Sequence, residues 1–213
     1  EDKLWKKGEA EKIQKESKGK DAIVKDVKKR QYKQSPPVPF NTTDLQAEAY
    51  AQFKYSPTQT LSIAESLYQA GYISYPRSSS QKLPANINYP KIMKALATLK
   101  PYLEFVNNLL KKEKLVPNEG KRDDPAHPAV YPTFEVADLK KLTSQQRRLY
   151  DLIVRRFLSV FADEAMRESN TITLDVGGNN FIIVGKRTLE AGWTKIYGPY
   201  MSTDELILPD LKI

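Results

Sequence analysis

Apolar side chains recur at helical spacing through the middle of the chain and alternate with polar side chains toward both ends. Leu61, Ala64 and Leu67 form one apolar stripe, which predicts an amphipathic helix in this part of the chain. Residues 171–176 (Thr-Ile-Thr-Leu-Asp-Val) instead alternate in the manner of a half-buried strand. The pattern therefore predicts a helical middle region between two β regions.

Helix-start signals divide the middle region further. Three Ser or Thr residues are each followed three positions later by Gln, which is the spacing of a capping box: Thr43/Gln46, Ser56/Gln59 and Thr143/Gln146. Pro57 suits the first position of a helix, and Gly71 suits the left-handed conformation at its end. We expect helices at 44–53, 57–70, 90–99, 101–112 and 144–165.

The first two of these helices, 44–53 and 57–70, are separated by a short break and predict a helix-turn-helix. Residues 72–75 continue directly from the second helix as an extended segment. A helix-turn-helix is typical of DNA-binding proteins, but it is also a common packed corner with no nucleic-acid role, and this feature alone does not separate the two interpretations.

The two ends of the chain predict a β domain that a helical domain interrupts. A polar helix ends near Gly19, and a charged strand follows over 22–33. A hairpin begins at Ser169, turns at 177–180 (Gly-Gly-Asn-Asn) and returns over 181–184, with a further β segment over 193–197. The expected fold class is α+β, in which a helical domain of helix-turn-helix, winged-helix-like character is inserted into a β-strand domain. The expected domain boundaries are 1–40, 41–166 and 167–213.

Composition narrows the functional classes. The chain has 213 residues, of which 40% are hydrophobic, so it can bury one large core or two modest ones. Its net charge of +8 suits a polyanionic partner, although many basic proteins have no nucleic-acid role. The absence of cysteine excludes disulfides, thiolate metal sites and cysteine catalysis. No apolar run reaches membrane-spanning length and no signal peptide is recognisable, so we expect a soluble, cytoplasmic protein without a membrane partner.

The tripeptide Tyr75-Pro76-Arg77 carries the clearest candidate chemistry. Proline favours an extended backbone before it, so Tyr75 and Arg77 are expected on the same face of a strand. A tyrosine oxygen can attack a phosphodiester, while a guanidinium stabilises the charge on the phosphate oxygens. The hydroxyls of the following serines, residues 78–80, are ordinary phosphate ligands. Without its neighbours, such a tripeptide is more often a packed edge.

Several ordered motifs surround the tripeptide, and with them the chain resembles the type IA DNA topoisomerases, in particular archaeal-type DNA topoisomerase I. The matching segments are Pro36–Phe40 leading into Asn41–Gln46, Leu67–Arg77, His127–Thr133 and Leu149–Phe157. In that family a β hinge domain carries a helical domain that holds the nucleophile. The resemblance therefore implies that the helical domain is inserted into a β-strand hinge domain.

The resemblance also implies roles for individual residues. Tyr75 attacks a single DNA strand and becomes linked to its 5′ phosphate, Arg77 positions the scissile phosphate, and His127 contacts DNA near the cleavage site. Further DNA contacts are expected from Ser78, Ser80, Thr43 and Gln46. Two positions depart from the family pattern: Ser79 stands where an acidic residue is frequent, and Tyr131 where arginine is frequent.

A separate nucleotidyl-transfer domain of the Toprim type supplies Mg²⁺ and acid-base groups in the family, and nothing in this sequence matches it. The pairs Asp123-Asp124 and Asp163-Glu164 are expected to be solvated charges. Because the chain also begins at Glu1 rather than Met, we expect a fragment of a longer polypeptide that binds no metal or cofactor itself.

The expected partners are DNA, preferentially single-stranded, and the remaining domains of the same polypeptide, with the protein as a monomer. The full enzyme would relax negative supercoils without ATP by passing a strand through a protein gate, and the fragment alone would be inactive in relaxation. An alternative function is a non-catalytic module for single-stranded DNA in which Tyr75 is structural or stacks on a base. A tyrosine recombinase or type IB enzyme ranks low, because the sequence lacks their arginine-rich catalytic set.

Overall fold

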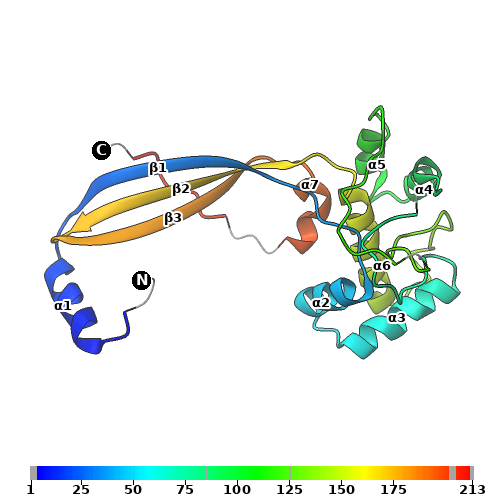
Figure 1. The fold of residues 1–213 in the computed structure, drawn as a ribbon, viewed down its shortest axis with the longest axis horizontal. Coiled ribbons are helices and arrows are strands. Elements are labelled where there is room, and N and C mark those ends of the chain that lie inside the picture. Colours follow the sequence, from blue (N-terminus) through cyan, green and yellow to red (C-terminus); the bar gives the residue numbers. More distant parts are fainter. Residues whose placement is uncertain (1–3, 85, 125, 202–204, 212–213) are drawn as a thin grey trace. The chain divides into compact units, whose positions relative to one another are not determined.

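The computed structural model describes residues 4–84, 86–124, 126–201 and 205–211. Contacts divide the chain into two compact units. The sheet unit comprises Glu1–Gln34, Met166–Glu190 and Thr203–Ile213, and the helical unit comprises Ser35–Ala165 and Ala191–Ser202 (Figure 1). Residues 191–202 thus belong by their contacts to the helical unit, whereas the predicted span 167–213 groups them with the β domain.

The sheet unit is built on three long strands in the order β1-β2-β3. These are β1 (Ala22–Gln34), β2 (Ala165–Val176) and β3 (Asn179–Glu190), preceded by helix α1 (Lys7–Ser17). Strands β2 and β3 are antiparallel, with Ser169 opposite Lys186, and their turn places Gly177 and Gly178 at positive φ. Such a two-residue turn favours glycine because the twist of the hairpin requires the left-handed region.

Strands β2 and β3 extend well beyond the predicted alternating segments, 171–176 and 181–184. The hairpin continues through polar residues, because Arg167 and Glu168 on β2 are buried and paired rather than solvated. The Arg187 Nη2 lies 2.8 Å from Glu168 Oε1, and the Arg167 Nη1 donates to Thr188 Oγ1 at 2.6 Å. Charged residues interrupt the alternation of apolar and polar side chains, so the alternation identified only part of each strand.

The helical unit holds most of the helices. They are α2 (Thr42–Phe53), α3 (Pro57–Gln69), α4 (Tyr89–Leu96), α5 (Leu103–Leu109), α6 (Ser144–Ser159) and α7 (Thr194–Tyr197), followed by the 3₁₀ turn η1 (Gly198–Tyr200). Helix α3 packs against both α2 and α6, and α6 also packs against α7. Their apolar faces form one core that includes Phe40, Leu67, Leu152, Ile153 and Phe161.

Two of the three predicted helix caps are present and one is wrong. The Ser56 side chain caps α3, and Thr143 with Gln146 forms a complete capping box at α6. At α2, however, the Oδ1 of Asn41 accepts from the backbone N–H of Asp44 at 2.7 Å, so the helix begins at Thr42 and Thr43 lies in its first turn. Asparagine is as good a cap as threonine, and the burial of Asn41 selects it.

The segment around Trp193 is helical, and the predicted β assignment there is wrong. Trp193, Ile196 and Tyr197 are buried in the helical core, and the Nη1 of Arg155 on α6 donates to the Ile196 carbonyl at 2.8 Å. A short apolar run does not distinguish a strand from a helix, so tertiary contacts decide. Helix α6 is also shorter than predicted, since it ends at Ser159 and β2 begins at Ala165.

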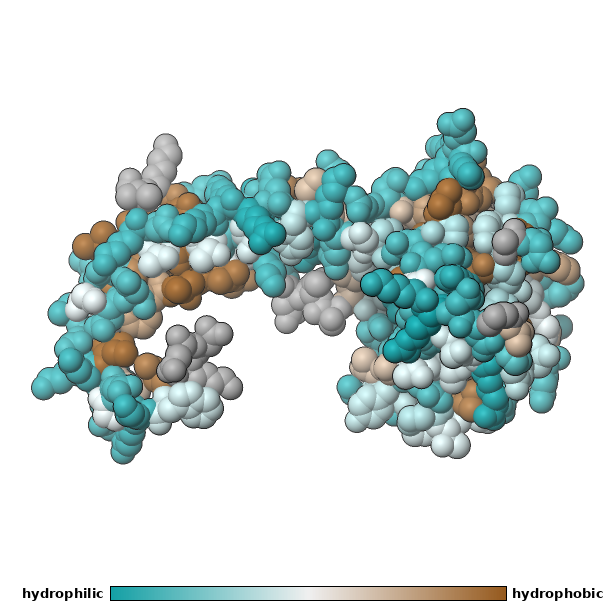
Figure 2. All heavy atoms as spheres, viewed as in Figure 1, coloured by the Kyte–Doolittle hydropathy of each residue, from teal (hydrophilic) through white to brown (hydrophobic). Residues whose placement is uncertain are grey.

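None of the helices in the described part of the chain is long and apolar enough to cross a membrane. The most apolar side chains of the helical unit are instead enclosed by its own helices. In the sheet unit, brown apolar spheres lie along the strands between teal polar ones (Figure 2), and Ile182 and Val184 of β3 are exposed there.

Candidate active site

The segment that carries Tyr75 leaves α3 and runs extended without joining a sheet. Beside it, Ile73 forms an isolated antiparallel bridge with Pro132, and the N–H of Ser74 donates to the Tyr131 carbonyl at 2.9 Å. From Tyr75 to Ser80 the residues are alternately exposed and buried. Tyr75 and Arg77 therefore share the exposed side, as the extended backbone around proline predicted.

The first residue of α2 anchors this segment from the other side. The Thr42 hydroxyl donates to the Pro76 carbonyl at 2.7 Å and accepts from the Ser78 N–H at 2.8 Å. The Thr42 N–H also donates to the Ser78 carbonyl at 2.9 Å. Because these bonds bracket Arg77, they hold the backbone of Tyr75-Pro76-Arg77 in place. Thr42 lies next to the helix cap Asn41, and no sequence pattern had marked it as part of the site.

Ser78 and Ser80 are buried, and their hydroxyls are used within the protein. The Ser78 hydroxyl donates to the His127 carbonyl at 2.5 Å and accepts from the Ser80 N–H at 3.0 Å, while the Ser80 hydroxyl accepts from the Lys82 N–H at 3.1 Å. Ser80 is only 1% exposed. This geometry gives no support to the predicted phosphate contacts of Ser78 and Ser80, because both hydroxyls hold the loop together.

Ser79 is the exposed serine of the three, and it shares its side of the segment with Tyr75 and Arg77. Its hydroxyl donates to Asp124 Oδ2 at 3.3 Å. The alternation of an extended chain could have identified it from the sequence, since positions 75, 77 and 79 point the same way.

Tyr75 is 39% exposed, and its ring contacts two other rings. Its centroid is 5.3 Å from that of Tyr68 in an edge-to-face contact, and 5.6 Å from that of His127. These contacts restrict the direction of the ring while the phenol remains accessible. The fold thus brings His127 beside Tyr75, although the two are far apart in the sequence.

Arg77 forms an ion pair with Glu65 of α3. Its Nε and Nη2 donate to one carboxylate oxygen, Oε1, at 2.9 and 2.6 Å. The arginine side chain remains 56% exposed, and exposed ion pairs contribute little stability, so an incoming phosphate can replace Glu65 at low cost. No local sequence signal connects Glu65 with Arg77, because only the turn after α3 brings them together.

Asp124 connects Ser79 and His127. Its carboxylate accepts from the backbone N–H groups of Ala126 and His127 at 3.0 and 3.2 Å, and lies 3.6 Å from Nδ1 of the His127 ring. The Ala126 N–H is the largest influence that lowers the pKa of Asp124 below 3.8, with the His127 N–H and the Ser79 hydroxyl adding to it. Asp124 is therefore part of the site, which corrects the expectation of a merely solvated charge.

The other acidic residues expected to be solvated have partners as well. Asp123 pairs with Lys82 at 2.9 Å, Asp163 pairs with Lys112 at 2.7 Å, and Glu164 accepts from the Ser35 hydroxyl at 3.0 Å. All three interactions are largely exposed. They stabilise loops of the helical unit rather than form a second chemical centre.

Thr43 and Gln46 lie on α2, the helix whose first residue anchors the Tyr75 segment. Thr43 is exposed in the first turn, and the Gln46 side-chain amide donates to the Pro57 carbonyl at 3.2 Å across the α2–α3 junction. Their contact with DNA remains a prediction.

The site does not fit a divalent metal ion. Within the ranges that the structure describes, no group of three or more His, Asp or Glu side chains is arranged to hold one. Glu65, which pairs with Arg77, and Asp124, which lies beside His127, are both engaged by the donors described above. The arrangement provides a nucleophile, a cation and an oriented imidazole, but no carboxylate cluster.

Comparison with known proteins places these residues in a family. The family model described as DNA topoisomerase matches residues 1–213. DNA topoisomerase 1 of Pyrococcus horikoshii is 45% identical over 212 residues, covering 100% of this chain and 31% of the relative. DNA topoisomerase 1 of Methanothermobacter thermautotrophicus is 41% identical over 209 residues, covering 98% of this chain and 28% of the relative. The chain therefore spans about a third of the length of these relatives.

The fold has a counterpart among solved structures. Full-length topoisomerase I from Thermotoga maritima superimposes with a TM-score of 0.66 at 22% sequence identity, and the match covers 100% of this chain and 35% of that chain. At this identity, the similarity is evidence for a shared fold alone. Evidence for family membership comes from the family model, which matches the whole chain, and from the sequence identity to the archaeal relatives. This chain belongs to the type IA DNA topoisomerase family.

Proposed function

We propose that this chain is the nucleophile-bearing part of a DNA topoisomerase and that Tyr75 attacks one strand of DNA. The observation that carries the proposal is the accessible Tyr75 phenol, which lies beside His127 and on the same side of its segment as Arg77. Most other tyrosines of the helical core are buried, among them Tyr102 and Tyr150. Tyr75 is thus a phenol that a DNA strand can reach next to a cation.

The reaction is a transesterification. The Tyr75 oxygen forms a bond to the phosphorus of a phosphodiester, and the bond from that phosphorus to the 3′ oxygen breaks. The phenol loses its proton, the departing 3′ oxygen gains one, and the 5′ phosphate stays on Tyr75. Attack by the same 3′ hydroxyl reverses every step, so the strand is resealed without ATP.

Arg77 and His127 assist this exchange by binding the phosphate. Arg77 leaves Glu65 and directs its guanidinium to the phosphate oxygens, where it stabilises the added negative charge. Asp124 orients the segment that carries His127, whose ring can donate a hydrogen bond next to the phenol. Glu65 therefore serves as the resting partner that keeps Arg77 in place before DNA binds.

Mg²⁺ enters this proposal only through the family resemblance. The residues described above do not form a site for it, so we assign the ion to parts of the full-length enzyme beyond the third that this chain spans. When bound there, the ion would supply electrostatic stabilisation of the phosphate. Within this chain, Arg77 provides that stabilisation.

The two units suggest how cleavage serves strand passage. We infer that the sheet unit is the hinge and that the helical unit is inserted into it. The helical unit, in which α2 and α3 form a helix-turn-helix, moves together with the DNA end that is bonded to Tyr75. The full enzyme would act as a cytoplasmic monomer that relaxes negative supercoils, with single-stranded DNA as the preferred substrate. The chain alone is expected to be inactive in relaxation.

The test replaces the matching segment of a full-length relative with this chain and incubates the protein with an end-labelled single-stranded oligonucleotide. On a denaturing gel, Tyr75→Phe should abolish the covalent protein–DNA adduct while leaving DNA binding unchanged. Tyr68→Phe is the matched control, because Tyr68 is a neighbouring exposed phenol, and it should retain the adduct. An adduct that persists in Tyr75→Phe would eliminate Tyr75 as the nucleophile.

A non-catalytic module for single-stranded DNA is the second candidate. The Tyr68 and Tyr75 rings are both exposed and in contact, so they could serve as a platform on which bases stack. Binding without any adduct in the unsubstituted chimera, together with weaker binding in both Tyr68→Ala and Tyr75→Ala, would favour this function.

A further inference from the structure

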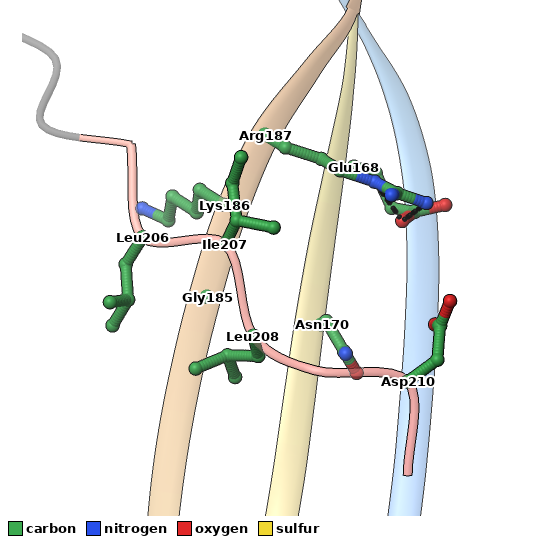
Figure 3. Close-up of a pocket in the computed structure, with 9 residues that line it drawn as sticks. All are labelled: Glu168, Asn170, Gly185, Lys186, Arg187, Leu206, Ile207, Leu208 and Asp210. Atoms are coloured by element: carbon green, nitrogen blue, oxygen red, sulfur yellow. Dashed lines mark hydrogen bonds and ion pairs between the residues drawn. The ribbon is translucent and has the colours of Figure 1, made fainter.

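The two faces of the three-stranded sheet differ in what covers them. Residues 205–211, here called the C-terminal strap, cross one face (Figure 3). The Lys186 N–H donates to the Leu206 carbonyl at 2.9 Å, and Asp210 forms an ion pair with Lys29. The Glu168–Arg187 pair lies on this covered face. The charged side chains on the covered face are therefore largely neutralised by one another.

The residues of β2 show which face is which. Glu168, Asn170 and Ile172 are buried, whereas the alternating residues Ser169 and Thr171 are only partly buried. Successive side chains of a strand point to opposite faces, so Ser169 and Thr171 belong to the face opposite the strap. Lys186, which is paired with Ser169 in the register, points to that face as well.

A hollow on this open face is lined mainly by cations. Its lining consists of Lys28, Arg30, Tyr32, Lys33, Ser169, Thr171 and Lys186. The set contains four cations, two hydroxyls and one aromatic ring, and no acidic residue. Asp26, which lies outside this lining, pairs with Lys28 at 3.0 Å. From the sequence, this region was predicted only as a charged strand over 22–33.

We propose that this open face, here called the cationic face, binds the phosphate backbone of single-stranded DNA independently of Tyr75. Lysine and arginine neutralise phosphates and release counterions, and hydroxyls such as those of Ser169 and Thr171 donate to phosphate oxygens. The Tyr32 ring among the cations offers a surface on which an unpaired base can stack. A stacking ring favours single strands, because bases in a duplex are already stacked.

The cationic face belongs to the sheet unit, whereas Tyr75, Arg77 and His127 belong to the helical unit, so binding at this face is separate from cleavage. An anionic lipid surface would also attract the cations, and Ile182 and Val184 of β3 are exposed. The hydroxyls and the partly buried Tyr32 ring favour nucleic acid, because they match phosphate oxygens and bases rather than acyl chains.

The test measures binding of a fluorescent oligo(dT) of about 20 nucleotides to the 213-residue chain by anisotropy at several salt concentrations. The face variant changes Lys28, Arg30, Lys33 and Lys186 to Gln. The control variant changes Lys6, Lys7, Lys12 and Lys15 to Gln, which removes the same charge from the same unit at α1. Thermal unfolding of each variant verifies that the chain is folded.

In the face variant, affinity should fall about tenfold and the slope of log K against log salt should flatten by up to about 3, since each contact with a single strand contributes about 0.7. The control variant should change the slope by less than about 1. Tyr32→Ala should weaken binding to the single strand and leave duplex binding unchanged, because only unpaired bases can stack on the ring.

Equal losses in the face and control variants would show that net charge alone acts, and would overturn the proposal. No loss in the face variant would overturn it too. The proposal would also be overturned if the face variant lost binding to vesicles of anionic phospholipid while its binding to the oligonucleotide was unchanged. The proposed function fails separately, since its readout is the Tyr75 adduct, and Tyr75→Phe should leave binding at the cationic face intact.

Discussion

The helical unit and the sheet unit are stabilised in different ways. Of the apolar side chains that are buried in the described residues, Ile172 is the one that belongs to the sheet unit, and the others form or adjoin the core of the helical unit. The sheet unit relies on its strand pairing and on ion pairs such as Lys25–Asp175 and Lys29–Asp210. A packed core can hold Tyr75 in a defined place, whereas ion pairs at the surface respond to salt.

The tyrosines of the helical unit show the same contrast on a smaller scale. Burial raises the pKa of Tyr150 to about 12, and it also raises the pKa values of Tyr102, Tyr197 and Tyr200. All four side chains pack in the core, and the hydroxyls of Tyr102 and Tyr200 also donate to Asp151. Tyr75 is instead exposed at the rim of this core. The core thus supplies rigidity, and its rim exposes the side chain that we propose as the nucleophile.

The largest expected effect of a single substitution on stability is in the helical core. Leu152→Ala should lower the free energy of unfolding of the helical unit by about 2–5 kcal/mol, because it leaves a cavity beside fully buried neighbours. Ile182→Ala in the sheet unit is the matched control, since Ile182 is 68% exposed, and it should change stability by less than about 0.5 kcal/mol. Denaturant titration measures both, and similar losses would refute the contrast.

A smaller effect is expected at the hydrogen-bond centre of the helical unit. Asp151 accepts from the hydroxyls of Tyr102 and Tyr200 and from Arg155 Nε, and so joins α6 to the segment that contains α7. Asp151→Asn should cost about 1–3 kcal/mol in the same titration, because it removes the charge that these donors share. Asp138→Asn, at an exposed acid, should have no measurable effect; equal losses would show that this network is dispensable.

In the sheet unit, a methyl group added at Gly185 is expected to displace the C-terminal strap. A Cβ on Gly185 would lie 2.6 Å from both the Leu206 carbonyl oxygen and Leu208 Cγ, so Gly185→Ala should lift the strap at a cost of about 1 kcal/mol. Hydrogen exchange of the Lys186 N–H, which donates to Leu206, should become faster. Gly8→Ala, where the space around the glycine is open, should leave that exchange unchanged. Unaltered exchange in Gly185→Ala would mean that the strap is not held there.

The smallest expected effect is a difference between two carboxylates whose pKa values are lowered by different kinds of group. In the helical unit, the Ala126 N–H is the main group that lowers the pKa of Asp124, whereas in the sheet unit Lys29 lowers the pKa of Asp210. Both carboxylates therefore stabilise the fold above their ordinary pKa and lose that contribution as the pH falls through the lowered values.

Salt should distinguish these two carboxylates. Raising the salt concentration to about 1 M should move the pKa of Asp210 up toward its ordinary value, because it screens the ion pair. It should leave the pKa of Asp124 nearly unchanged, since a backbone N–H carries no net charge. NMR titration of the two side chains measures both values, with Asp124→Asn to assign the loop signal. A large salt shift at Asp124 would contradict the distinction.

Local features of the fold were predictable because their cause lies within a few residues. The caps at Ser56 and Thr143, the helices that they begin and the turn at Gly177-Gly178 follow from short-range backbone chemistry. The choice of Asn41 over Thr43 at α2 did not follow, because both side chains can cap and only burial distinguishes them. The helix at α7 escaped prediction for a similar reason, since Arg155 and the core determine it.

By itself, the sequence determined the order of the motifs and the placement of Tyr75 and Arg77 on one side of an extended segment. Only the tertiary structure brought His127 beside Tyr75, paired Arg77 with Glu65, and made Asp124 a partner of Ser79. It also buried Ser78 and Ser80, which the sequence presented as ligands. The alternation of an extended chain is encoded at every second residue, whereas a hydrogen bond between distant residues exists only after the helices have packed.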